Sequence, residues 1–186
     1  MAREIWRAAQ QGLHFDSLVF VDETGTTTNM TRTHGWGPKG KPVLGKAPHG
    51  HWMTSTFVAG LKHDGILAPM LIDTAMTGAL FHQWLAEHLI PEMAPGSIVV
   101  MDNLPAHKVA QVRQCLEKAG MGLLYLPAYS PDFNPIEQVF AKTKALLRRA
   151  APRSFDAICE ALKAILDRFS PAECSNYIRH AGYVQT

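Results

Sequence analysis

Two short runs of apolar residues, each leading into an aspartate, constrain the fold of this chain most. Leu18–Val21 is followed by Asp22, and Ser97–Met101 is followed by Asp102. Runs of this length, rich in β-branched residues and without polar alternation, predict strands that are buried on both faces. Such strands need helices packed on both sides of the sheet, which indicates an α/β architecture.

Three further segments have the composition of strands. Met53–Leu61 and Ile66–Ile72 flank a spacer that contains Asp64-Gly65, a dipeptide typical of hairpin turns. Leu123–Leu126 predicts the fifth strand. We therefore predict a mixed five-stranded sheet, three antiparallel strands and then two parallel ones, flanked by helices.

Apolar residues at helical spacing predict helices between the third and fourth strands, between the fourth and fifth, and after the fifth. Thr77 is predicted to cap the first of these helices, and Pro91 together with Pro95-Gly96 is predicted to end it. Another helix is expected from about Pro135 to Arg149.

The length of 186 residues is typical of one domain. Residues 1–16 predict a short helix and exit loop, interpreted as the remnant of a connection to an upstream part. Residues 17–150 form the expected core domain, and residues 151–186 predict helices packed on the same domain.

Segment 24–51 is predicted to be an inserted basic loop, because it is rich in glycine and proline. No Asp or Glu occurs from Thr24 to His63. A long ordered loop of this kind is usually functional, and we favour contact with a polyanion. The candidate nucleic-acid contacts are Arg32, Trp36, Lys39, Lys41 and Lys46. The alternative is a solvated insertion with Trp36 packed into the core.

Overall composition excludes several classes of protein. The apolar fraction of 47% excludes intrinsic disorder, and no apolar run is long enough to span a membrane. Three cysteines without a CxxC pair predict reduced thiols in a cytoplasmic protein. The net charge of +2 alone does not identify a partner.

The two strand-end aspartates are candidate metal ligands. If the strands are parallel neighbours, Asp22 and Asp102 lie side by side at the sheet edge where ligands bind in open α/β sheets. Two close carboxylates are unfavourable unless a cation lies between them, and oxygen ligands suit Mg²⁺ or Mn²⁺. The alternative is that each Asp simply ends a strand or caps a turn.

Glu137 is the third candidate carboxylate. Asn134 as N-cap, Pro135 at the first helical position and Glu137 at the third match a capping box, so Glu137 has a structural alternative role. Asp132 is a rival ligand. Lys144, seven residues further along the helix, is expected on the same face as Glu137 and within reach of a phosphate.

Three blocks together resemble a known family. They are VFVDETG at 19–25, VMDNLPAHK at 100–108 and LPAYSPDFNPIE at 126–137. In this order, with 34 residues between Asp102 and Glu137, they resemble the DDE transposases of the Tc/mariner superfamily, specifically the bacterial insertion-sequence branch.

The resemblance implies an RNase H-like fold in which Asp22, Asp102 and Glu137 hold two Mg²⁺ ions, replaceable by Mn²⁺. It implies cleavage and joining of double-stranded DNA in cut-and-paste transposition, usually into a TA step. Asn103 and Asn134 are expected to support the ligands. His107, Lys108 and Lys144 are expected to contact DNA, and a homodimer would hold the two element ends.

Members of this family normally carry helix-turn-helix domains before the catalytic part. Asp22 lies so near the start that we expect a catalytic domain without one, with a separate helix-turn-helix polypeptide as a possible partner. The alternative hypothesis is an inactive fragment that only binds DNA or dimerises. A magnesium titration distinguishes the two, because only catalysis needs the cation.

Overall fold

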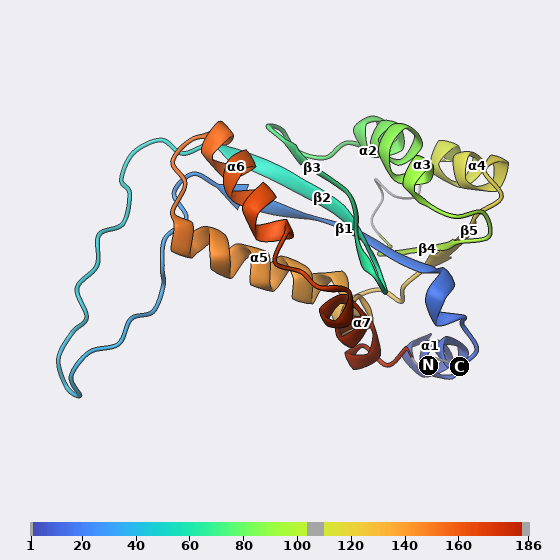
Figure 1. The fold of residues 1–186 in the computed structure, drawn as a ribbon, viewed down its shortest axis with the longest axis horizontal. Coiled ribbons are helices and arrows are strands. Elements are labelled where there is room, and N and C mark those ends of the chain that lie inside the picture. The colour runs from blue at the N-terminus through green and yellow to red at the C-terminus, as the bar shows by residue number, and fades with distance from the viewer. Residues whose placement is uncertain (1, 104–109, 184–186) are drawn as a thin grey trace.

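The computed structural model describes residues 2–103 and 110–183, which form three layers, with helices on both faces of one sheet (Figure 1). The strands are β1 (Leu18–Thr27), β2 (Thr54–Lys62), β3 (Gly65–Ile72), β4 (Ile98–Met101) and β5 (Gly122–Tyr125). The α-helices are α1 (Ala2–Gln10), α2 (Gly78–Trp84), α3 (Ile90–Glu92), α4 (Ala110–Lys118), α5 (Ile136–Ala150), α6 (Phe155–Leu166) and α7 (Pro171–His180).

The sheet has the strand order β3-β2-β1-β4-β5. β1 pairs antiparallel with β2, which pairs antiparallel with β3. β4 pairs parallel with β1 on one side and with β5 on the other. The predicted mixed sheet of three antiparallel and two parallel strands is confirmed.

Alternate residues of the central strands pack into two separate cores. Phe20 and Val100 face a core formed with α5, α6 and α7, which includes Phe140 and Ile178. Val19, Val21, Val99 and Met101 face the other core, which α2, α4 and the turn between α2 and α3 cover with Phe81, Trp84, Leu89, Val112 and Leu116. Burial on both faces explains why these strands are apolar runs without alternation.

β1 is longer than its apolar run. Its antiparallel pairing with β2 continues to Thr27 opposite Thr54, well beyond the last parallel pair, Val21 with Met101. The predicted loop over 24–51 is therefore corrected at its start: residues 24–27 are strand, because β2 supplies their hydrogen-bond partners.

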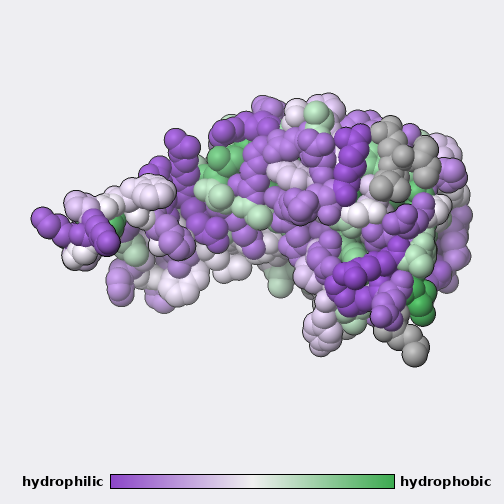
Figure 2. Space-filling model, turned by 90° about the horizontal axis from the view of Figure 1, so that it is seen from below, coloured by the Kyte–Doolittle hydropathy of each residue, from purple (hydrophilic) through white to green (hydrophobic). Residues whose placement is uncertain are grey.

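Residues 28–53 leave the sheet as a long arm without helix or strand, which extends far from the body (Figure 1). Figure 2 shows the same arm from below, on a face where hydrophilic side chains predominate. Trp36 is fully exposed, so the alternative that it packs into the core is wrong. At the base of the arm, Arg153 Nη1 donates to the carbonyl oxygens of Thr28 (3.0 Å) and Met30 (2.8 Å).

The helix that Thr77 caps ends at Glu92, between the two predicted stop signals Pro91 and Pro95-Gly96. Thr77 Oγ1 accepts from the Leu80 N–H (3.3 Å), as expected. A π-helical turn, Leu85–Leu89, then leads directly into α3, so Pro91 does not end the helix. Pro91 is tolerated because it lies in the first turn of α3, where its missing N–H costs little.

The two ends of the described chain meet on one side of the body (Figure 1). Trp6 Nε1 of α1 donates to the Tyr183 hydroxyl (3.2 Å), and Gln10 Nε2 donates to the Ala181 carbonyl (3.4 Å). The N-terminal helix is thus packed against the domain. None of the helices in 2–103 and 110–183 is long and apolar enough to cross a membrane.

Candidate active site

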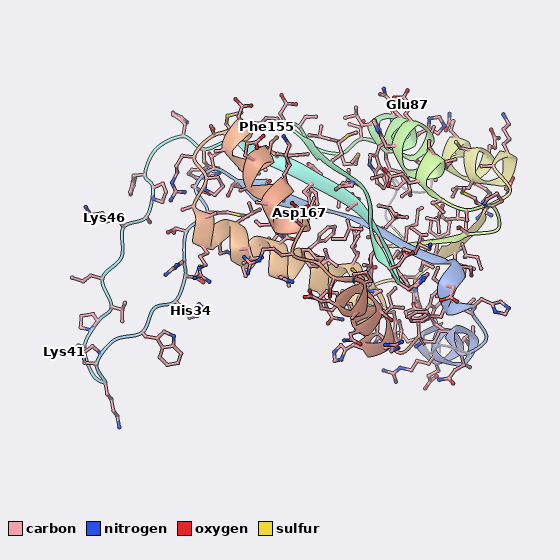
Figure 3. The ribbon with its side chains drawn as sticks, in the orientation of Figure 1. His34, Lys41, Lys46, Glu87, Phe155 and Asp167 are labelled. Atoms are coloured by element: carbon pink, nitrogen blue, oxygen red, sulfur yellow. The ribbon has the colours of Figure 1, made fainter. Side chains whose placement is uncertain are left out.

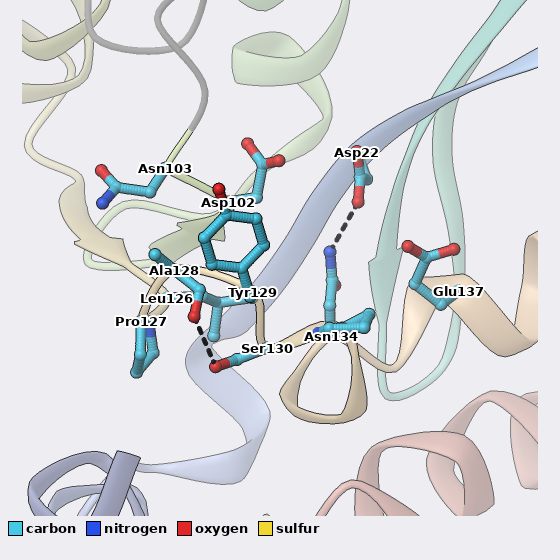
Figure 4. A pocket seen from close by; sticks show the side chains of 11 residues that line it. Asp22, Asp102, Asn103, Leu126, Pro127, Ala128, Tyr129, Ser130, Asn134 and Glu137 are labelled. Carbon is cyan, nitrogen blue, oxygen red and sulfur yellow. Dashed lines mark hydrogen bonds between the residues drawn. The ribbon is translucent and has the colours of Figure 1, made fainter. Parts of the chain in front are cut away.

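Three carboxylates from separate segments line one pocket of about 330 Å³, here called the acidic pocket. Asp22 belongs to β1, Asp102 directly follows β4, and Glu137 is the second residue of α5. Figure 4 shows the three side chains around the pocket, with Asn134 beside Asp22. The remaining wall is the segment from Leu126 to Pro131.

Strand register explains why Asp22 and Asp102 meet. The last parallel pair of β1 and β4 is Val21 with Met101, so the next residue of each strand is an aspartate at the same level. β4 ends there while β1 continues alongside β2. The sequence prediction that both aspartates lie at one sheet edge agrees with this register, although Asp22 is inside a strand rather than after it.

Burial and neighbouring charge change the acidity of Asp22. The residue is 9% exposed, and burial raises the pKa of its carboxyl to about 7. The N–H of Glu23 donates to Asp22 Oδ1 (2.8 Å) and opposes this rise, whereas the negative charges of Asp102, Glu23 and Glu137 add to it. The charges of Asp102 and Glu137 therefore reach the Asp22 carboxylate across the pocket.

Asn134 does not cap α5 as the local sequence predicts. Its Nδ2 donates to Asp22 Oδ2 (2.9 Å), and the N-cap position of α5 is Pro135, without a side-chain cap. The predicted capping box is therefore wrong: the Asn134 side chain is turned toward a buried carboxylate 112 residues away in the chain. Its Oδ1 is buried and without a hydrogen-bond partner.

The donor set of the acidic pocket fits a hard divalent cation. Among the described residues, no three His, Cys, Asp or Glu side chains converge closely enough to enclose an ion as they stand. Yet three carboxylates line the pocket, and their charges already raise the pKa of Asp22. Asn134 also lines the pocket, where its Nδ2 donates to Asp22 Oδ2. Carboxylate and amide oxygens are the ligands that Mg²⁺ and Mn²⁺ prefer.

Asn103 and Tyr129 also belong to the lining of the acidic pocket, and their side chains are oriented differently from each other. Asn103 lines the pocket, but Figure 4 shows its amide on the far side of Asp102 from Asp22. Tyr129 is 99% exposed at the rim with a positive φ of 55°, so it does not pack the turn. An aromatic ring held out at the edge of a carboxylate-lined pocket is suited to stacking on a base.

The other predicted site residues lie outside the acidic pocket. Lys144 is two helical turns along α5 from Glu137 and does not line it. Asp132 is paired with Arg3, so it is not a rival ligand (Nη2 to Oδ2, 2.6 Å). The candidate DNA contacts of the arm are Arg32, Trp36, Lys39, Lys41 and Lys46, and Figure 3 shows Lys41 and Lys46 far from the sheet. His107 and Lys108 lie outside the described residues.

Sequence reasoning missed the residues that hold the pocket wall from outside. Arg3 contacts the wall across 127 residues of sequence, and Tyr183 donates to the Phe133 carbonyl (2.9 Å) from near the other end. No local pattern signals such contacts, because each partner is ordinary in its own neighbourhood.

Fold and site together define a class: an RNase H-like domain with a carboxylate-lined pocket at the edge where β1 and β4 diverge. The chain belongs to the DDE superfamily endonucleases, because the model of that family matches residues 17–159. A search of curated proteins gave no match.

Solved structures of Mos1 transposase have the same fold as this chain. The Mos1 strand transfer complex matches with a TM-score of 0.78 at 22% identity, over 96% of this chain and 55% of that chain. The Mos1 paired-end complex with the left transposon end matches with a TM-score of 0.76 at 21% identity, over 96% and 56%. The catalytic domain of Mos1 mariner transposase matches with a TM-score of 0.70 at 17% identity, over 96% and 83%. This chain thus spans little more than half of the longer Mos1 chains.

Proposed function

We propose that this chain is the catalytic part of a transposase that cleaves DNA strands and joins a freed 3′-hydroxyl to target DNA in cut-and-paste transposition. The observation that carries the proposal is the convergence of Asp22, Asp102 and Glu137 on one pocket, in a chain of the DDE superfamily endonucleases. The proposal extends to membership of the bacterial insertion-sequence branch of the Tc/mariner superfamily, on the strength of the three sequence blocks.

In this proposal Asp22, Asp102 and Glu137 hold two divalent ions, Mg²⁺ or Mn²⁺. When bound, such a pair activates a water or hydroxyl nucleophile and stabilises the leaving oxygen of a phosphodiester. Mos1 paired-end complexes have been solved with Mn and with Mg, which supports the choice of metals.

The chain itself contributes positioning, the main requirement of phosphoryl transfer. Asn134 Nδ2 and the Glu23 N–H fix the two oxygens of Asp22, and the rigid backbone of β1 fixes its Cα. Glu137 is carried on the first turn of α5, where the helix dipole favours its negative charge. Tyr129 at the rim would stack on a base of the DNA near the reacting phosphate.

DNA binding is proposed for the arm. Arg32, Lys39, Lys41 and Lys46 would neutralise backbone phosphates, while the exposed Trp36 stacks or wedges. His107, Lys108 and Lys144 would add further contacts with the DNA. TA, as a flexible step, is the proposed target because it is cheap to kink. Mos1 has been solved in complex with transposon-end DNA, which supports a DNA substrate here.

Three further points remain proposals. We propose a homodimer that holds the two element ends together, a helix-turn-helix part on a separate polypeptide that recognises those ends, and a cytoplasmic location in a bacterial cell. Footprinting with this chain alone tests the second point: we expect no sequence-specific protection of element ends.

A strand-nicking assay on supercoiled plasmid with Mn²⁺ tests the catalytic proposal. We expect Asp22→Asn, Asp102→Asn and Glu137→Gln each to abolish nicking while the protein stays folded. The matched control is Asp167→Asn, which removes an exposed carboxylate at the end of α6 that does not line the pocket, and should nick like the parent (Figure 3).

Thermal melting separates catalysis from the alternative of an inactive DNA-binding module. By mass action, Mg²⁺ or Mn²⁺ at millimolar concentration should raise the melting temperature of the parent above its value in EDTA. The gap should shrink in the three acid variants and persist in Asp167→Asn. Identical melting of the parent with and without metal, together with no nicking, would favour the inactive module.

A further inference from the structure

One wall of the acidic pocket is held from outside by the N-terminal helix. The wall segment concerned is residues 130–134, here called the 130–134 turn. Arg3 of α1 forms a two-pronged ion pair with Asp132 (Nη1 to Oδ1, 2.8 Å; Nη2 to Oδ2, 2.6 Å). The same Nη1 donates to Ser130 Oγ (2.8 Å). Planar, paired hydrogen bonds of this kind fix orientation as well as distance.

Aromatic contacts complete this outer support. The Arg3 guanidinium lies 4.6 Å from the ring centroid of Phe133, and that of Arg7 lies 5.7 Å from it. Tyr183 donates its hydroxyl hydrogen to the Phe133 carbonyl, and Trp6 Nε1 of α1 donates to the same hydroxyl. The turn is therefore held by side chains from both ends of the described chain.

The inner side of the same turn holds the pocket. Asn134 ends the turn and donates to Asp22 Oδ2, and the Glu137 N–H donates to the Asn134 carbonyl (3.2 Å). The turn has little strength of its own: its short helical bonds are Phe133 N–H to Ser130 O (3.1 Å) and Asn134 N–H to Pro131 O (3.0 Å). Any movement of the turn would displace Asn134 and the start of α5 together.

We propose that Arg3, through Asp132, is a positioning residue that sets the placement of Asp22 and Glu137 for metal binding. The inference rests on the proposed function. It gives α1 a role in the site, and it gives Asp132 a role other than that of a ligand.

An effect on the site is separable from an effect on global stability. The Arg3–Asp132 pair is largely exposed (40% and 52% for the two side chains), and pairs of this kind contribute little to the stability of the whole fold. Metal ligands, in contrast, must be held within about half an ångström of the productive geometry. Loss of Arg3 should therefore weaken metal binding more than it lowers the melting temperature.

The test compares Arg3→Ala and Arg3→Lys with the parent in titration calorimetry with Mn²⁺ alone. We expect Arg3→Ala to bind Mn²⁺ about tenfold more weakly, as for other residues that support metal ligands. Arg3→Lys should bind Mn²⁺ with intermediate affinity. Its ammonium group keeps the positive charge but cannot form the paired, planar hydrogen bonds of a guanidinium. Nicking by Arg3→Ala should recover to the parental rate at saturating Mn²⁺.

Hydrogen exchange supplies the readout on the turn itself. In Arg3→Ala the amides of Phe133 and Asn134 should exchange faster, while those in the middle of β1 stay as protected as in the parent. The matched control is Lys163→Ala, which breaks another exposed ion pair (Lys163 Nζ to Glu160 Oε1, 2.7 Å) on α6. It should change neither Mn²⁺ affinity nor exchange in the turn.

Two outcomes would overturn the inference. One is Mn²⁺ affinity of Arg3→Ala within twofold of the parent. The other is faster exchange throughout the sheet, which would indicate general destabilisation instead of local positioning. Failure of the proposed function looks different: Asp22→Asn and Glu137→Gln would then bind Mn²⁺ as tightly as the parent does.

Discussion

Asp22 illustrates at residue scale how a site can be built at a cost in stability. Its carboxylate is buried, close to two other carboxylates, and compensated only in part by the Glu23 N–H and the Asn134 amide. In water the same group would ionise freely near pH 4. The folded chain therefore holds a charge that it disfavours, which is an arrangement suited to attracting a cation.

The cost of this charge leads to a prediction for Asp22→Asn in EDTA. Because folding raises the Asp22 pKa from near 4 to about 7, this carboxylate lowers stability progressively as the pH rises from about 4 to 7, and the full cost is present above pH 7. The variant keeps an oxygen that accepts from Asn134 but carries no charge. We expect it to melt about 5 °C above the parent at pH 8.

Calorimetric melts at two pH values test whether the Asp22→Asn protein melts above the parent when Asp22 is ionised. At pH 5 the folded parent is mostly protonated at Asp22 whereas the unfolded chain is mostly ionised, so the difference between the parent and Asp22→Asn should be clearly smaller than at pH 8, and it should vanish near pH 3. A variant that melts below the parent at pH 8 in EDTA would contradict the electrostatic account of the pocket. The Asp167→Asn protein serves as the control at both pH values.

At element scale, α5 connects the site to the rest of the molecule. It begins directly after the 130–134 turn, carries Glu137 in its first turn, and packs Val139, Phe140 and Leu147 against the sheet. Its end is fixed by Ala151, whose N–H donates to the Leu147 carbonyl (2.8 Å). Lys142 in its middle contacts α7. The placement of Glu137 thus depends on contacts along the whole helix.

Ala151 has a positive φ of 51° at the end of α5, a conformation that disfavours residues with a Cβ. We expect Ala151→Gly to stabilise the protein by about 0.5–1 kcal/mol. The matched control is Ala150→Gly in the last turn of the helix, which should destabilise by a similar amount. Urea denaturation measures both, and a loss of stability in Ala151→Gly would show that its methyl group makes contacts that outweigh the strain.

Glu173 joins α5 to α7. Lys142 Nζ donates to both Glu173 carboxylate oxygens (2.7 Å each), and the Tyr177 hydroxyl donates to Oε1 (2.6 Å). Burial alone would raise the Glu173 pKa, but the hydrogen bonds from Lys142 and Tyr177 outweigh it, so the pKa lies below its ordinary value. A lowered pKa gives stability that is present above the ordinary Glu pKa and lost as the pH falls through the folded value.

We therefore expect Glu173→Gln to lower stability at pH 7 by about 1 kcal/mol, or about 2–4 °C in melting temperature. The difference from the parent should narrow below pH 4, where the parent also loses the charge. Glu160→Gln on α6, which removes an exposed partner of Lys163, is the control and should have a smaller effect. An undiminished difference at pH 3 would contradict the role of the charge.

At the scale of the whole molecule, a packed body and a protruding arm are distinct. The body contains the two cores, whereas the exposed large apolar residues gather mainly on the arm: Trp36, Val43, Leu44, Trp52 and Met53. Thr27 and Thr54, at the two ends of the arm, are paired in the sheet. The pairing of β1 with β2 therefore does not depend on the particular sequence of the arm that joins them.

Replacement of residues 31–51 by a short Gly/Ser turn tests this separation. We expect the melting temperature to stay within about 2 °C of the parent, because residues 31–51 contribute no side chain to either core. DNA affinity at low salt should fall, and its dependence on salt should become shallower, since four basic side chains are removed. Unchanged DNA binding would exclude the arm as the contact surface, and loss of folding would show that the body depends on it.

The sequence by itself determined the strands, their mixed arrangement and the three carboxylates, because apolar runs, turn residues and short motifs act locally. The parallel register that brings Asp22 beside Asp102 was fixed only in the folded sheet. Only the tertiary structure decided the role of Asn134. Local rules assign this residue to a helix cap, but in the fold its side chain donates a hydrogen bond to the buried Asp22 carboxylate. The tertiary structure also decided the pairing of Arg3 with Asp132, because nothing in the neighbourhood of either residue encodes a partner more than a hundred residues away. Long-range contacts of this kind arise only when packing brings the segments together.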